Sequence, residues 1–166
     1  MRPVAPDPVG SEILSQLKSR DPYDQYFAVM SICDLERIEL LPAVVPLLES
    51  HCADLRYVAI QTIGDRGKSN QGYYGPLLMP FLENGDAEMR QYAAEALAAI
   101  DFQDSIPAIE KMLDAEIDEE TRQFTERALR FLRRQNTPED DLPVFRLMSV
   151  DLNSGPLDFE AAATVH

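Results

Sequence analysis

The chain has 166 residues, of which 45% are hydrophobic and 27% charged, a balance typical of one globular domain and not of a disordered chain. Its 15 Lys and Arg against 29 Asp and Glu give a formal net charge of −14. This charge argues against binding to nucleic acid or to an anionic membrane surface, because both need basic side chains, and it leaves a positively charged protein partner open.

Residues 1–10 lack the apolar run of a signal peptide, and we expect them to be disordered. Residues 11–19 predict the first helix, with Ser11 as its N-cap and Ile13, Leu14 and Leu17 along one face. No stretch approaches 18 uninterrupted apolar residues, and two cysteines are too few for a disulfide framework. These features favour a cytoplasmic protein that is not bound to a membrane.

From residue 25 onward, two landmarks recur with a period of 31 to 34 residues. The first is a short motif with one apolar face, and its copies begin at Gln25, Arg56, Arg90 and Arg122. The second is a proline that suits the first turn of a helix, and its copies are Pro42, Pro76 and Pro107. Each repeat therefore predicts two helices. Because no pair can bury its apolar face alone, we expect the pairs to stack side by side.

Acidic residues precede the first helix of a repeat, where the helix dipole favours negative charge. Asp86 with Arg90 and Asp118 with Arg122 have the spacing of stabilising i,i+4 pairs. Two of the second helices contain another proline four residues further in, at Pro46 and Pro80. These helices are expected either to start late or to be kinked.

The last predicted helix covers residues 119–134, and an acidic tail with three prolines follows at 137–166. Within this tail, Val144–Val150 is too apolar for a solvated linker. We expect this segment to fold back onto the flank of the last helix pair, because an end repeat leaves apolar surface uncovered. A peptide that binds another protein is the alternative.

The segment from Asp86 to Leu97 reads Asp-x-Glu-x-Arg-x-x-Ala-x-x-Ala-Leu, and residues 118–129 follow the pattern less closely. It resembles the short HEAT-like repeats named after phycobilisome lyases, over roughly residues 11–134. The resemblance implies an all-α fold, a short right-handed α-solenoid of three and a half to four helix pairs over residues 11–136, with an irregular C-terminal tail. Such repeats mostly serve as binding scaffolds, so the resemblance says little about activity.

The loop predicted at residues 64–75 is longer than its counterparts and is a candidate for partner contact. It carries two bases in an acidic protein, Arg66 and Lys68, and two adjacent aromatic residues, Tyr73 and Tyr74. We expect one of the two tyrosines to pack under the helix pair.

Three patterns that could carry chemistry are incomplete. Residues 67–69 match only the end of a phosphate-binding motif, because Thr62 stands where that motif has its first glycine. His51, Cys52 and Asp54 lie too close in one turn to act as nucleophile, base and orienting group. With two histidines in the chain and no acidic calcium loop, we expect no catalytic residue, metal or cofactor.

Acidic residues concentrate between Glu83 and Glu120, where twelve acids face only Arg90 and Lys111. About half of them suit a solvated face or a helix N-terminus. The others are expected to line one side of the stack and to attract a basic protein: Glu83, Asp86, Glu110, Asp114 and Glu116.

The sequence thus favours a non-enzymatic protein-binding module, either an adaptor or a bacterial inhibitor of the immunity type that masks a basic protein. The alternative, which rests on the repeat subtype alone, is a bilin lyase subunit or a chaperone of a chromophore-carrying protein. A third hypothesis is an assembly scaffold that recruits other proteins through its tail.

Overall fold

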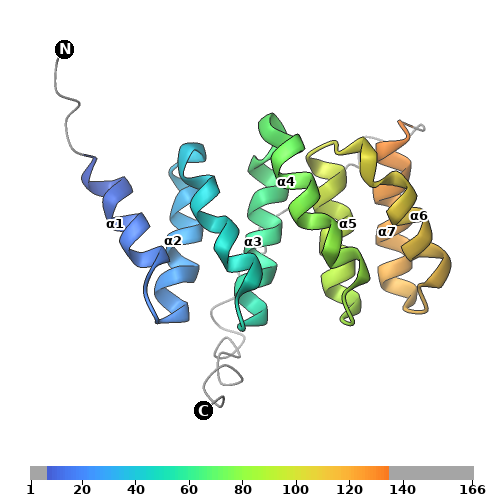
Figure 1. Ribbon diagram of the computed structural model, residues 1–166, viewed down its shortest axis with the longest axis horizontal. Helices are drawn as coiled ribbons and strands as arrows, with labels where there is room; N and C mark the ends of the chain where they lie inside the picture. Colours follow the sequence, from blue (N-terminus) through green and yellow to red (C-terminus); the bar gives the residue numbers. More distant parts are fainter. Residues whose placement is uncertain (1–6, 135–166) are drawn as a thin grey trace. The chain divides into compact units, whose positions relative to one another are not determined.

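The computed structural model describes residues 7–134, and every regular element in that range is a helix (Figure 1). The prediction of an all-α fold is confirmed. The described chain divides into two compact units, one ending at Ala59 and the other beginning at Ile60, and α3 (Ala53–Arg66) runs from the first into the second. Residues 1–6 and the predicted tail 137–166 lie outside the described residues.

The first unit contains α1 (Pro8–Leu17), α2 (Pro22–Asp34) and the 3-10 helix η1 (Ile38–Glu49), each of which packs against the other two. Their apolar faces meet in one core, which includes the buried side chains of Ile13, Leu17, Val29, Ile32, Leu41 and Val44.

The first helix starts earlier than predicted. Asp7 is the N-cap of α1, and its Oδ1 accepts a hydrogen bond of 3.1 Å from the backbone N–H of Gly10. Pro8 fits the first turn because its missing N–H would have no partner there. Ser11 lies inside the helix, where its Oγ donates to the Asp7 carbonyl, so the prediction of Ser11 as N-cap is wrong and residues 8–10 are helical.

The additional prolines change the type of helix. Pro42 and Pro46 both lie inside η1, and Pro80 lies in η3 (Met79–Glu83), a 3-10 helix that continues α4 (Gln71–Leu78). A proline cannot donate the i→i−4 hydrogen bond of an α-helix, and these segments are wound more tightly. Pro80 lies in the first turn of η3, as the predicted late start requires. η1 contains both of its prolines and shows neither a late start nor a simple kink.

The second unit forms two layers of helices. α5 (Ala87–Ala99) packs against α7 (Glu119–Leu132) in one layer, and η3 packs against α6 (Ile106–Ala115) in the other. η3 also packs on α5, and α6 on α7, which closes the core. Two short 3-10 helices, η2 (Lys68–Asn70) and η4 (Gln103–Ser105), precede α4 and α6.

The residue on which the repeats align has the same structural role in all four copies. Its side chain donates to backbone carbonyls at or just beyond the end of an earlier helix, where such groups lack a partner within the helix. Gln25 Nε2 donates to Leu17 at 3.2 Å. The Nη1 atoms of the arginines donate as follows: Arg56 to Ser50 and His51, Arg90 to Asn84 and Gly85, Arg122 to Leu113 and Glu116.

Candidate functional site

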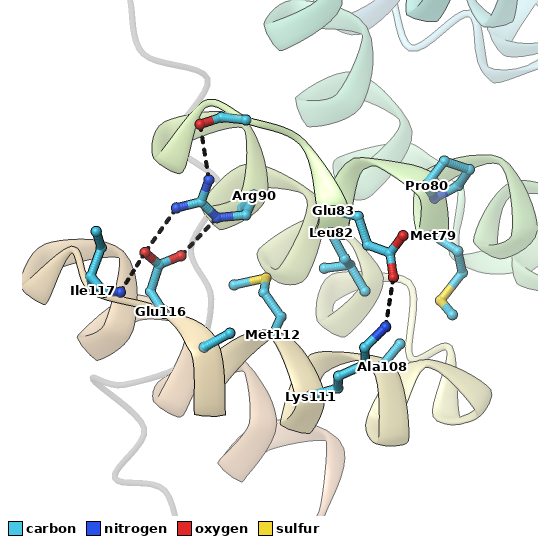
Figure 2. A pocket seen from close by; sticks show the side chains of 12 residues that line it. Met79, Pro80, Leu82, Glu83, Arg90, Ala108, Lys111, Met112, Glu116 and Ile117 are labelled. Carbon is cyan, nitrogen blue, oxygen red and sulfur yellow. Dashed lines mark hydrogen bonds and ion pairs between the residues drawn. The ribbon is translucent and has the colours of Figure 1, made fainter.

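A groove with a volume of about 720 Å³ lies between η3 and α6 of the second unit (Figure 2). Its lining is mainly apolar and includes Met79, Leu82, Ala108, Met112 and Ala115. Leu82 and Met112 are buried and form part of the core as well. The two wall helices thus leave an open apolar surface between them.

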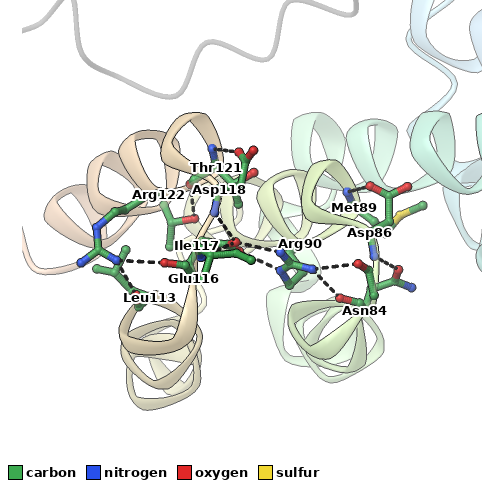
Figure 3. A network of polar contacts seen from close by, with 12 residues as sticks. Asn84, Asp86, Met89, Arg90, Leu113, Glu116, Ile117, Asp118, Thr121 and Arg122 are labelled. Carbon is green, nitrogen blue, oxygen red and sulfur yellow. Dashed lines mark hydrogen bonds and ion pairs between the residues drawn. The ribbon is translucent and has the colours of Figure 1, made fainter.

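Arg90 and Glu116 close one end of this groove with a bidentate ion pair. Arg90 Nε donates to Glu116 Oε2 and Arg90 Nη2 to Glu116 Oε1, both at 2.8 Å. Glu116 Oε1 also accepts from the backbone N–H groups of Ile117 and Asp118, at 3.0 Å each (Figure 3). The network ties the start of α5 to the turn between α6 and α7.

This network keeps the Glu116 carboxylate charged although its side chain is only 1% exposed. The hydrogen bonds from Arg90 are the main cause of a pKa lowered to about 2, and the backbone N–H groups of Asp118 and Ile117 lower this pKa further, whereas burial raises it. Glu116 is therefore a fixed part of the wall rather than a group that is free to exchange partners.

A second ion pair crosses the mouth of the groove. Lys111 Nζ on α6 lies 3.0 Å from Glu83 Oε1 on η3, and both side chains are more than three-quarters exposed (Figure 2). Such exposed pairs stabilise a protein little, because water and salt screen them. This contact can open without much cost, unlike the pair of Arg90 and Glu116.

Ile117 is an unusual element of the groove lining. Ile117 is 96% exposed, and its backbone N–H donates a hydrogen bond to Glu116 Oε1. Next to an apolar groove, an aliphatic side chain held in water is typical of a surface that another molecule covers.

The structure separates the five acidic residues that the sequence placed on one binding side. Glu83 and Glu116 line the groove, but each is paired with a base. Glu110 forms an ion pair with Arg133, the residue after α7, Asp86 is the N-cap of α5, and Asp114 is exposed. Asp86 and Asp118, which the sequence spacing predicted to pair with Arg90 and Arg122, are the N-caps of α5 and α7. Each accepts a hydrogen bond from a backbone N–H group of its own helix.

Arginines from α7 oppose more of the acidic charge than a count along the sequence suggests. Arg127 pairs with Glu95 at 3.3 Å, and Arg134, just after α7, pairs with Asp101 at 3.1 Å. These partners are 32 and 33 residues apart, so a local count of charges could not find them. The predicted charge concentration is therefore partly neutralised.

Acids remain at the N-terminal ends of α5 and α7, and we call this group the acidic edge: Asp86, Glu88, Asp118, Glu119 and Glu120. Burial and the nearby carboxylates of Glu88, Glu95 and Glu120 raise the pKa of Tyr92 on α5 to about 12. The carboxylates that raise the pKa of Tyr92 thus come from both α5 and α7. The acidic edge adjoins the end of the groove, because the N–H of Asp118 binds Glu116.

The predicted loop at residues 64–75 is largely helical, since α3 ends at Arg66 and α4 begins at Gln71. Tyr74 is 3% exposed and Tyr73 is 47% exposed, which confirms that one of the two tyrosines packs inside. Their rings meet edge to face at a centroid distance of 5.0 Å. Lys68 is exposed in η2, and none of these residues lines the groove.

Metal binding, catalysis by His51 and Cys52, and membrane spanning have little support in residues 7–134. No group of three or more His, Cys, Asp or Glu side chains there is arranged to hold a metal ion. Cys52 is buried whereas its neighbour His51 is exposed, so the two side chains do not form a catalytic pair. No helix in the described range is both long and apolar enough to span a bilayer.

Comparison of the sequence with family models gives no match, and comparisons with curated proteins and with solved structures give none either.

Proposed function

We propose that the protein is a non-enzymatic module that binds a segment of a protein partner in the groove between η3 and α6. The preferred segment is apolar and carries Lys or Arg. The observation that carries this proposal is the open apolar groove with the exposed Ile117 in its lining and the acidic edge at one end.

The two features have different physical roles in binding. Burial of partner side chains against Met79, Ala108 and Met112 would supply most of the affinity, since apolar contacts in a desolvated groove dominate such interfaces. The acidic edge would speed the association of a positively charged segment and select against an acidic one.

The wider architecture is part of the same proposal. The recurrent hydrogen bonds of Gln25, Arg56, Arg90 and Arg122 and the two-layer packing of the second unit support HEAT-like helix pairs in a short right-handed α-solenoid. Repeats of this kind present grooves between their second helices, which suits an adaptor or an inhibitor that masks a basic protein in the cytoplasm.

Selection of a phage-displayed library of random peptides on the full-length protein tests the function. We expect peptides rich in apolar residues together with Lys or Arg, whose binding weakens at least tenfold in the variant Ala108→Glu. Ser69→Glu, which adds the same charge to an exposed site in η2 that does not line the groove, is the matched control. Peptides without basic residues, or equal binding to both variants, would overturn the proposal, provided that thermal melting shows both variants folded.

A further inference from the structure

The described chain ends beside the groove. α7 ends at Leu132, and the next residue, Arg133, forms an ion pair with Glu110 of α6. Glu110 directly precedes Lys111, which lines the groove. The 32 residues that follow Arg134 therefore start next to the wall of the groove.

The length of this following chain is ample. Val144 is the tenth residue after Arg134, and ten extended residues span up to about 33–36 Å. α6 has 10 residues, so the wall of the groove is about 15 Å long. The segment from Val144 to Val150 can reach any point of the groove without strain in the connection.

The chemistry of this segment matches the groove. Val144-Phe145-Arg146-Leu147-Met148-Ser149-Val150 combines five apolar residues with the only Lys or Arg in residues 137–166. Asp141 and Asp151 flank it. The groove has an apolar lining that suits the apolar residues of the segment. In its exposed ion pair, Glu83 is complementary to Arg146, and Lys111 is complementary to the flanking aspartates.

We infer that residues 144–150 bind in the groove between η3 and α6 of the same molecule and compete there with a partner. Because the connection is short, the effective concentration of the segment at the groove is in the millimolar range. Even a weak intramolecular contact would then keep the groove covered. The docking follows from the groove and the tail alone, whereas the competition rests on the proposed function.

The absence of tryptophan from the chain gives a direct test. In the full-length variant Phe145→Trp, docking predicts blue-shifted emission and weak quenching by acrylamide. Adding Ala108→Glu should shift the emission to the red and raise the quenching constant several-fold, whereas adding Ser69→Glu should change neither. Emission typical of an exposed indole in Phe145→Trp itself, or equal spectra for the two double variants, would overturn the docking.

A second measurement avoids the larger tryptophan side chain. In the unsubstituted chain with labelled methionine methyl groups, we expect nuclear Overhauser effects from Met148 to Met79 or Met112, and their absence contradicts docking. Competition is tested separately with Phe145→Asp, which should tighten the binding of a selected peptide several-fold. Unchanged peptide affinity refutes competition, whereas failure to select any peptide refutes the proposed function and leaves the docking result standing.

Discussion

Replacing Glu116 by glutamine should remove a large part of the stability of the second unit. The Glu116 carboxylate accepts two hydrogen bonds from Arg90 and two from backbone N–H groups in a site from which water is nearly excluded. The difference between its ordinary pKa of 4.5 and the folded value of about 2 corresponds to about 3 kcal/mol. Leaving the Arg90 guanidinium without its counter-ion gives a cost of similar size, about 3–5 kcal/mol for a buried pair.

The pH dependence has a defined sign. Because folding lowers the pKa of Glu116, its contribution is fully present above about pH 4.5 and is lost as the pH falls through about 2. Between pH 7 and pH 3, this one group should account for about 2 kcal/mol of lost stability. Urea unfolding followed by circular dichroism at both pH values measures it, as the difference between the unsubstituted chain and Glu116→Gln.

Glu83→Gln is the matched control for this experiment, because it changes a carboxylate in the same groove whose ion pair is exposed. We expect little change in the free energy of unfolding for this variant. A loss below about 1 kcal/mol for Glu116→Gln at pH 7, or the same pH dependence as the unsubstituted chain, would refute the reasoning.

Three further changes test the fold and the groove. Gly75→Ala should lower the free energy of unfolding in urea by about 1–3 kcal/mol, because a Cβ there would collide with the Phe102 ring. The control is Gly72→Ala on the same helix, whose Cβ would meet nothing within 4 Å. Equal stability of the two variants would contradict this packing. Arg56→Met should lower the free energy of unfolding by about 1–3 kcal/mol, since it leaves two carbonyls without their donor, and an unchanged value speaks against the capping role. Ile117→Ser should leave the melting temperature unchanged and weaken the binding of selected peptides, and unaltered binding would exclude this side chain from the contact surface.

Local patterns in the sequence predicted the helical part of the fold well. The repeated arginines indicated the positions of helices, because amphipathic periodicity is a property of a single segment. Of the three repeated prolines, Pro107 lies in the first turn of α6 as predicted, whereas Pro42 and Pro76 lie inside η1 and α4, which start earlier than predicted. The last helix was expected at 119–134 and is found at Glu119–Leu132. The start of α1 was missed because Asp7 and Ser11 are both good caps, and only the Pro8 that follows Asp7 distinguishes them.

The candidate site depended on contacts that are distant in the sequence. Glu83 and Glu116 were selected as candidates for their charge, but their partners Lys111 and Arg90 lie 28 and 26 residues away, and spacing alone could not pair them. The groove itself was not predicted, because it arises where η3 and α6 pack beside each other. A signal was available in Ile117, an aliphatic residue in an acidic turn where nothing local would bury it.

The most direct test of the binding groove uses the methionines as reporters. Met79 and Met112 line the groove, whereas Met30 lies on α2 in the other unit. Titration of the methyl-labelled full-length protein with a selected apolar, basic peptide should shift the methyl resonances of Met79 and Met112 and leave that of Met30 in place. Saturable binding that leaves both groove methyls unshifted would contradict the account.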